Sequence, residues 1–336
     1  MKRILPLFLA LALLLTGCTA VSTTESTSQT VSQVDSPSSA PESASSQLES
    51  AGEVSITDSN GSHITFGNSA PRVVAAYGSF AEAWLLAGGE LVGVTQDALE
   101  QRDLGLPEDI AVVGTVKEPN AEEIIALEPD LVLLASDITA QAEIRDVLEN
   151  AGLACAFFQV DTFADYAFMM EQLCAVTGRE DLYEENVTQV GQQIEEAQAN
   201  AALSSTRPNV LLIRAFSTGI KAKTDDELAG AILKDLGAHN IADDHPSMLE
   251  DLSLEEVIAA DPDYIFVTTM GDEQKALDYL NGLIQQNPAW SELSAVKEDR
   301  YVVLPKDLFH YKPNNRWGES YQYLGEILYP QLFHEE

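Results

Sequence analysis

Positive charge is scarce in this sequence of 336 residues. There are 18 lysine and arginine residues against 54 aspartate and glutamate residues, which gives a formal net charge of −36. A surface that binds nucleic acid needs a basic face to neutralise phosphates, so this balance excludes nucleic acid as a partner. The few cations are also unevenly placed, because most of them follow residue 206.

Histidine and cysteine are scarce as well. The five histidines are scattered, no Cys-x-x-Cys or His-Glu-x-x-His motif is present, and a receptor for bare zinc or manganese needs about four converging ligands. That function is therefore the weaker alternative. No nucleophile elbow, glycine-rich phosphate loop or spaced His, Asp and Ser set occurs, which argues against an enzyme. Cys155 and Cys174 lie on apolar and helical patterns that predict buried thiols, and a disulfide between them stays open.

Long hydrophobic runs are absent except at the start of the chain. Lys2 and Arg3 precede the apolar stretch "ILPLFLALALLL", which is shorter than the ~20 residues that a membrane-spanning helix needs. "LTGC" follows, and the whole predicts a secretory signal over residues 1–18. Residues 19–50 contain no aromatic residue and no positive charge. They cannot bury enough apolar surface to fold and are predicted to form a disordered, Ser/Thr-rich tether.

Apolar strands alternate with amphipathic helices in the rest of the chain. The dipeptide Asn60-Gly61 predicts the turn of an early β-hairpin. Continuous apolar strands between helices indicate parallel sheets that are covered on both faces. The predicted strands cover residues 72–77, 91–95, 111–116, 130–135 and 154–160 in the first half, and 209–216, 263–269 and 300–305 in the second.

One sequence unit occurs twice. Residues 120–134 read "NAEEIIALEPDLVLL", and residues 253–267 read "SLEEVIAADPDYIFV", at a constant offset of 133 residues. The unit is a helix, a Pro-Asp stop and a strand. Between the copies, residues 179–205 predict a long and mostly polar helix, as expected of an element that joins two domains. The sequence thus predicts an α/β protein with two Rossmann-like lobes, residues 51–178 and 206–336, each with a central, mainly parallel sheet, joined by one long interlobe helix.

These features together resemble a known family. The signal with its terminal cysteine is similar to a bacterial lipoprotein lipobox. The family resemblance is carried most specifically by three internal segments, "RVVAAYGSFAEAWLLAGG", "GTVKEPNAEEIIALEPDLVLL" and "LSLEEVIAADPDYIFV". The chain resembles the substrate-binding lipoproteins of ABC importers, in the helical-backbone (class III) group that binds ferric siderophores, haem or cobalamin. The resemblance implies that Cys18 is lipidated and that the protein is anchored to the outer face of the cytoplasmic membrane.

The resemblance also implies partners. Glu122 and Glu255, one in each copy of the repeat, match the glutamates that dock on arginines of the membrane permease dimer, which works with a cytoplasmic ATPase. Which member of each Glu-Glu doublet docks is left open, because neighbouring helix positions diverge by ~100°. We expect a monomer with no cofactor of its own. Its expected ligand is an iron chelate, a ferric siderophore before haem or cobalamin.

A ligand site is expected at the carboxyl ends of the strands, where two-lobe α/β proteins bind their ligands. Cations gathered on the loops there suggest an anionic ligand, and Arg214 is the strongest candidate because a guanidinium presents a fork of donors. Met270 and His310 are candidates for ligating iron directly, with His310 the possible metal ligand. The predicted ligand-binding residues are Tyr77, Phe80, Lys117, Arg214, Lys221, Lys223, Met270, His310, Tyr311, Lys312 and Arg316.

Overall fold

The structure, a computed structural model, describes residues 54–67, 70–250 and 252–333. The predicted signal, the lipidation site Cys18 and the tether lie outside the described residues. The first described element is the expected hairpin, β1 (Val54–Thr57) and β2 (His63–Phe66), in which Gly61 has a φ of +76°. No helix in the described part of the chain has the length and apolar character needed to cross a membrane.

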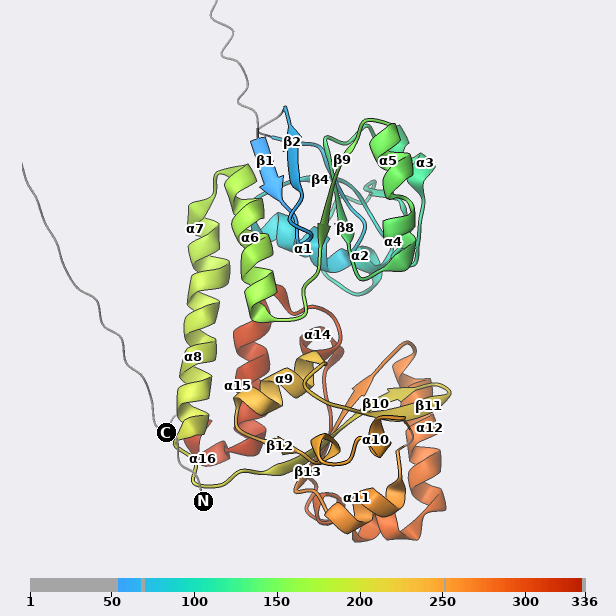
Figure 1. The fold of residues 1–336 in the computed structure, drawn as a ribbon, viewed down its shortest axis with the longest axis vertical. Coiled ribbons are helices and arrows are strands. Elements are labelled where there is room, and N and C mark those ends of the chain that lie inside the picture. The colour runs from blue at the N-terminus through green and yellow to red at the C-terminus, as the bar shows by residue number, and fades with distance from the viewer. Residues whose placement is uncertain (1–53, 68–69, 251, 334–336) are drawn as a thin grey trace, which may run out of the picture. The chain divides into compact units, whose positions relative to one another are not determined.

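A five-stranded parallel sheet forms the centre of the N-terminal lobe (Figure 1). Its strand order is β5-β4-β3-β8-β9. Continuous apolar runs such as β8 are buried along their whole length because helices cover the sheet. The strands are β3 (Val73–Ala75), β4 (Leu91–Val94), β5 (Ala111–Val112), β8 (Leu131–Ala135) and β9 (Ala154–Phe158), and β6 (Gly114–Thr115) and β7 (Glu118–Pro119) form a separate hairpin. The helices are α1 (Gly78–Leu86), α2 (Asp97–Glu100), α3 (Ala121–Ala126), α4 (Thr139–Glu143) and α5 (Arg145–Asn150).

The C-terminal lobe has a second sheet of the same kind with one antiparallel edge. Its order is β11-β10-β13-β14, and β12 also pairs with β10. Its strands are β10 (Asn209–Phe216), β11 (Gly219–Lys223), β12 (His239–Asn240), β13 (Tyr264–Thr269) and β14 (Tyr301–Val303). Its helices are α9 (Leu228–Asp235), α10 (Ser247–Glu250), α11 (Leu254–Ala260), α12 (Glu273–Gln286), α13 (Ser294–Lys297), α14 (Lys306–Phe309), α15 (Trp317–Leu328) and α16 (Pro330–Phe333), with 3₁₀ turns η2 (Ile241–Asp243), η3 (Pro288–Glu292) and η4 (Asn314–Arg316).

Strand β11 corrects the sequence analysis, which took this segment as a ligand loop. It pairs antiparallel with β10, and Phe216 lies opposite Gly219 across a tight turn. Lys221 is exposed while Ala222 is buried, the alternation of an edge strand with one face on the core. Its lysines therefore stand on a sheet rather than on a mobile loop.

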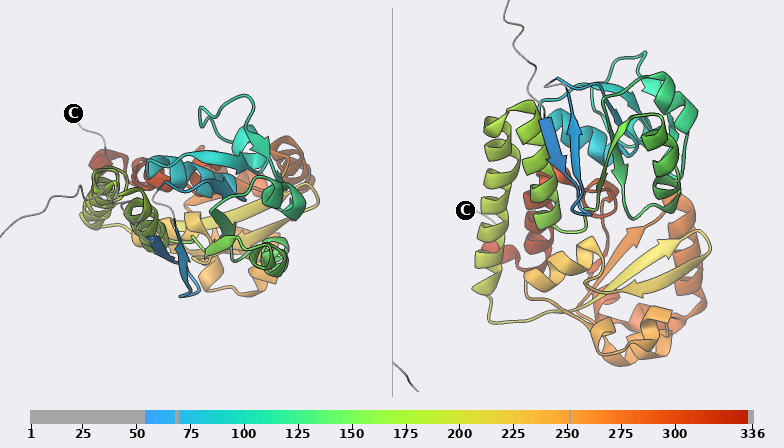
Figure 2. Two further views of the ribbon diagram at one scale, coloured as in Figure 1. Left: turned by 90° about the horizontal axis from the view of Figure 1, so that it is seen from above. Right: turned by 45° about the horizontal axis from the view of Figure 1, so that its top comes forward.

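The two lobes are joined by a nearly continuous helix. Helix α6 (Phe163–Thr177) precedes it, and α7 (Glu180–Tyr183), a π-helical segment η1 (Glu184–Thr188) and α8 (Gln189–Ala202) follow one another without a break (Figure 1). Val190, Ile194, Ala197 and Ala201 form a buried stripe along α8 at helical spacing. Helix α15 packs beside α8, as the views in Figure 2 also show.

One hydrophobic core runs through this connection. It includes Val73 and Leu131 of the first sheet, Ile194 of α8, Leu212 of the second sheet and Leu324 of α15. Two smaller clusters cover the opposite faces of the two sheets. The interlobe helices thus share their packing with both sheets, which makes the connection stiff.

The repeat seen in the sequence is also a structural repeat. Glu128 and Asp261, separated by the same offset of 133 residues, end their helices with positive φ angles of 46° and 42°. Non-glycine residues adopt this conformation infrequently, so its recurrence at matched positions is specific. Cys155 and Cys174 are both buried and free.

Candidate ligand-binding site at the strand ends

Three of the predicted cations lie on one face of the β10–β11 ladder. Arg214 and Lys221 are directly paired across the strands, and Lys223 stands two residues beyond Lys221, so all three side chains emerge on the same face. Two of these cations are already paired. The carboxylate of Glu227 contacts the guanidinium of Arg214, and its Oε1 lies 2.8 Å from Nζ of Lys223. Asp226 lies 3.6 Å from the same Nζ.

His310 lies near this face, at the end of α14. Its ring is half-buried, and Nδ1 is buried without a hydrogen-bond partner among the described residues. Burial and the positive charges of Arg214, Lys306 and Lys312 lower the pKa of His310 to about 4. The imidazole is therefore neutral at physiological pH.

Lys306 is a member of this cationic group that sequence reasoning missed. Its Nζ donates a hydrogen bond of 2.5 Å to the carbonyl of Gly271, which places it at the end of β13 beside Met270. The described residues provide no ion-pair partner for Lys306 or for Lys221. Met270 itself is exposed. The run "PKDLF" gave no signal for this role, because a lysine in the first turn of a short helix is usually a solvated charge.

Tyr77 of the N-terminal lobe and Tyr311 of the C-terminal lobe both lie in the fields of Arg102 and Asp97. Tyr77 follows β3, and burial raises its pKa to about 12. Burial and the negative charge of Glu273 raise the pKa of Tyr311, which also lies in the fields of Arg102 and Asp97 of the other lobe. Both phenols stay protonated and can donate hydrogen bonds to an anion. A pocket of about 310 Å³ beside Tyr311 is lined from both lobes.

Phe80 does not face this site, contrary to the sequence analysis. Its side chain is 1% exposed, and its ring packs edge-on against Tyr77, with 5.3 Å between the ring centroids, and against Phe158. Phe80 therefore packs against the ring of Tyr77 and fixes its position. Trp317 is likewise buried in the core, as expected of an anchor for the last helix. Lys117 is exposed in the turn between β6 and β7.

A buried polar network holds the segment that follows Tyr311 against the other lobe. The amide of Asn314 donates to the carbonyl of Ser79 at 2.9 Å and to the carboxylate of Glu82 at 2.6 Å. Arg102 pairs with the same carboxylate and donates to the carbonyl of Lys312 at 2.9 Å. No sequence motif pointed to these residues, because they come from separate elements and become partners only in the fold.

Lys312 spans the lobes through its side chain. Its Nζ lies 3.1 Å from Asp161, which follows β9. Burial opposes ionisation of Asp161, but hydrogen bonds from Gln159 and Lys312 and the charge of Lys312 outweigh it and lower the pKa of Asp161. Lys312 is therefore a cation of the site, and its ion pair with Asp161 connects the two lobes.

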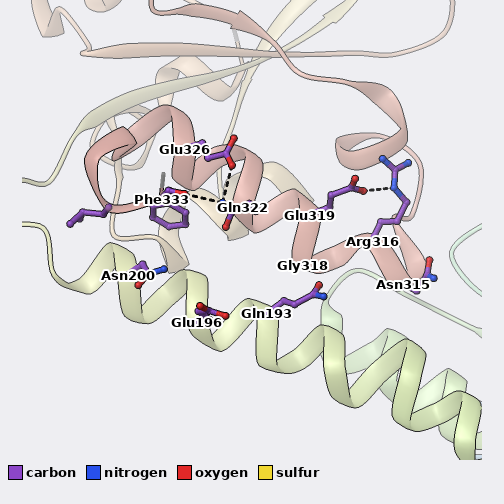
Figure 3. Close-up of a pocket in the computed structure, with 11 residues that line it drawn as sticks. Gln193, Glu196, Asn200, Asn315, Arg316, Gly318, Glu319, Gln322, Glu326 and Phe333 are labelled. Carbon is purple, nitrogen blue, oxygen red and sulfur yellow. Dashed lines mark hydrogen bonds and ion pairs between the residues drawn. The ribbon is translucent and has the colours of Figure 1, made fainter. Parts of the chain in front are cut away.

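Arg316 lines the pocket beside Tyr311, but acidic residues pair with its guanidinium. Its guanidinium pairs with Asp307 at 2.7 Å and with Glu319. It also lines a polar groove of about 940 Å³ between α8 and α15, drawn in Figure 3 with Gln193, Glu196 and Asn200 opposite Glu319, Gln322 and Glu326. The groove is larger than the pocket at Tyr311, but Arg316 is the one cation among the described residues that line it, whereas Arg214, Lys221 and Lys223 gather on the β10–β11 ladder. We therefore place the ligand site at the strand ends.

The two repeat helices expose carboxylates, Glu122 and Glu123 on α3 and Glu255 on α11. Asn120 caps α3 by accepting from the amides of Glu122 and Glu123, and Ser253 caps α11 by accepting from the amide of Glu256. Glu122 and Glu255 are both exposed. The carboxylate of Glu256 accepts a hydrogen bond from Ser247 at 3.0 Å and is thereby occupied.

The chain matches known proteins over most of its length. The model of a family described as periplasmic binding protein matches residues 73–308. The Fe(3+)-citrate-binding protein YfmC of Bacillus subtilis is 26% identical over 273 residues, which cover 78% of this chain and 82% of that protein. Staphylococcus aureus SirA complexed with staphyloferrin B has a TM-score of 0.62 at 20% identity, covering 84% of this chain and 99% of that one. S. aureus IsdE complexed with heme has a TM-score of 0.63 at 19% identity, covering 77% and 99%.

The family match and the arrangement of the two lobes point to the same class of protein. The matched residues include strands of both sheets and the helix that joins them. The candidate site lies where such lobes bind ligands, at the carboxyl ends of parallel strands. The chain therefore belongs to the periplasmic binding protein family and is a substrate-binding protein of an ABC importer rather than an enzyme.

Proposed function

We propose that this protein captures an anionic ferric chelate outside the cytoplasm, with a ferric siderophore as the favoured ligand, and delivers it to the permease of its importer. The observation that carries the proposal is the group formed by Arg214, Lys306 and Lys312 around His310, whose Nδ1 has no hydrogen-bond partner among the described residues. In a chain with a net charge of −36, cations gathered at strand ends favour a negatively charged ligand. The phenols of Tyr77 and Tyr311 supply further donors and aromatic surface.

Relatives with different ligands support the class of ligand. YfmC is named for ferric citrate, SirA is complexed with staphyloferrin B, and IsdE is complexed with heme. Citrate and the propionates of haem carry carboxylates that a guanidinium binds in a bidentate manner. The proposal assigns this recognition to Arg214.

Haem is the second candidate, and one feature favours it. Met270 is exposed at the end of β13, and Lys306, which lowers the pKa of His310, donates a hydrogen bond to the carbonyl of the adjacent Gly271. A thioether and a neutral imidazole are both suitable axial ligands for haem iron. The cations nearby would then hold the propionates.

Delivery of the ligand to the permease depends on Glu122 and Glu255, the glutamates at matched positions of the repeat. We assign permease docking to Glu255 because Glu256 accepts a hydrogen bond from Ser247, and to Glu122 because it holds the matched second position of α3, where Glu123 is exposed as well. Two similar carboxylates, one on each lobe, suit a permease dimer with arginines at its entrance. The anchor belongs to this proposal too: a lipid on Cys18 and the tether would keep a monomer beside its permease.

A titration of the purified protein with ferric citrate, ferric siderophores, haem, hydroxocobalamin and zinc tests the proposal. Trp84, Trp290 and Trp317 are buried, so quenching of their fluorescence reports energy transfer to a coloured ligand rather than direct contact. Zinc, which is colourless, is followed by calorimetry. Tight binding of a ferric chelate supports the proposal. A Soret shift with haem alone supports the second candidate, and tight zinc binding without any chelate contradicts both.

A further inference from the structure

Glu227 is the acidic residue at the centre of the cationic face. Its carboxylate bridges Arg214 and Lys223, and the three side chains are only 15%, 14% and 23% exposed. A carboxylate held between a guanidinium and an ammonium makes the contacts that a carboxylate of an anionic ligand would make. An anionic ligand and Glu227 therefore compete for the same donors.

The loop before α9 holds Glu227 in this position. Asp226 accepts hydrogen bonds from the amide and the hydroxyl of Thr224, and the amide of Glu227 donates to the carbonyl of Thr224 at 3.3 Å. The loop lies so close to α9 that a Cβ at Gly230 would be 1.9 Å from the Thr224 carbonyl oxygen. Glu227 is thus positioned by a tight turn, unlike a surface acid that meets a cation by chance.

The Glu227 side chain is nevertheless free to leave. Glu227 occupies the N-cap position of α9, but its carboxylate makes no capping hydrogen bond. It also leaves part of Arg214 unused, because the buried Nε of Arg214 has no hydrogen-bond partner among the described residues. Its departure would cost the helix no cap, and a ligand carboxylate would take over its contacts with Arg214 and Lys223.

We propose that Glu227 is a specificity-determining residue of this site, a built-in competitor that an anionic chelate must displace from Arg214 and Lys223. This inference rests on the proposed function. A chelate with several negative charges displaces Glu227 by engaging both cations together. A neutral chelate cannot displace it and leaves the bridge intact. Glu227 thereby makes the affinity of the site depend on the negative charge of the ligand.

The test compares Glu227→Gln with the wild type by titration with ferric citrate and with a neutral ferric trihydroxamate. Removal of the competing charge is expected to tighten ferric citrate binding at least about fivefold, because a partly buried ion pair no longer has to be broken. Binding of the neutral chelate should change less than about twofold. The matched control is Asp225→Asn, which removes the same charge from the same loop but breaks only the ion pair with Lys234 on α9.

The outcomes separate the inference from the proposed function. Wild-type binding of ferric citrate with no gain in Glu227→Gln, or an equal change for both chelates, overturns the inference alone. Absence of binding of every ferric chelate to both proteins overturns the proposed function and the inference with it. Should Glu227→Gln melt well below the wild type, Glu227→Asp keeps the charge but is one methylene too short to bridge both cations. It must then show a smaller gain in the same direction.

Discussion

Asp130 and Asp263 make the same pair of hydrogen bonds, one in each lobe. The amide of Asp130 donates to the carbonyl of Arg72 and its Oδ2 accepts from the amide of Arg72, both at 2.8 Å. Asp263 makes the two equivalent bonds to Asn209, also at 2.8 Å. Asp130 directly precedes β8 and aligns it with the neighbouring parallel strand β3. Asp263 does the same for β13 and its neighbour β10. This is the structural reason for the Pro-Asp pair in both copies of the repeat.

Replacement of Asp263 by alanine should destabilise the protein by about 1–2 kcal/mol, because a hydrogen bond to a charged acceptor is lost and the amide of Asn209 loses its partner. Denaturant unfolding measures the change. Asp109→Ala, at an exposed loop position, serves as the control and should stay within about 0.5 kcal/mol of the wild type. A loss no larger than that of the control would show that the repeated aspartate has no role in aligning the strands.

The sheets were predictable because burial on both faces leaves a continuous apolar run. Leu131–Ala135 and the first part of β10 read as buried strands without any knowledge of their neighbours. The repeat predicted two lobes, since each half of the chain contains one copy of the same helix–strand unit. The π-helical turns of Glu184–Thr188 left no comparable pattern, because an inserted turn changes the helix register without changing residue types.

The charges of the site were only partly predictable. A sequence shows that Arg214 and Lys223 are cations, but it does not show that Glu227 neutralises both. The same limit applies to Lys312 and Asp161, which are 151 positions apart, and to Arg316, which is paired with Asp307 of α14 and Glu319 of α15. Electrostatic partners are set by distances in the fold, so counts of charged residues overestimate the free positive charge of a site.

Charge reversal at Glu122 and Glu255 should abolish uptake by whole cells, because each carboxylate would be replaced by a charge that repels the arginines of the permease. Loss of both contacts is expected to lower uptake at least about tenfold while the affinity for the ligand stays unchanged. Glu256→Gln is the matched control, since Ser247 occupies that carboxylate, and uptake should remain near the wild-type rate. A parallel fall in uptake and in ligand affinity would assign the two glutamates a structural role.

Stability should fall between neutral pH and pH 4 partly because of His310. Its pKa is lowered from 6.5 to about 4, so the unfolded chain holds more protons at this residue than the folded protein throughout that window. Stability therefore rises with pH across the window and is lost as pH falls through it. His310→Asn should reduce the slope of melting temperature against pH between 4 and 6.5, whereas His63→Asn, on an exposed position of β2, should leave it unchanged. Identical slopes in wild type and His310→Asn would contradict the neutral, buried imidazole.

Asn314 should be the most sensitive single position in the contact between the lobes. It is fully buried, has a φ of +52°, and donates to Ser79 and Glu82 of the other lobe. Alanine removes both hydrogen bonds and strains the backbone, whereas glycine removes the hydrogen bonds but tolerates the positive φ. We expect a loss of about 2–4 kcal/mol for Asn314→Ala and about 1 kcal/mol less for Asn314→Gly, measured by denaturant unfolding.

The difference in stability between Asn314→Ala and Asn314→Gly separates the cost of backbone strain from the contribution of the side-chain hydrogen bonds. If glycine restores full stability, backbone conformation alone explains the residue, and the amide contacts to Ser79 and Glu82 contribute nothing. If both variants lose stability and the affinity for ferric citrate falls with it, the network does more than hold the fold. It then keeps Lys312, whose carbonyl accepts from Arg102 in the same network, in register with the cationic face. A loss of stability with unchanged affinity would confine the network to the fold.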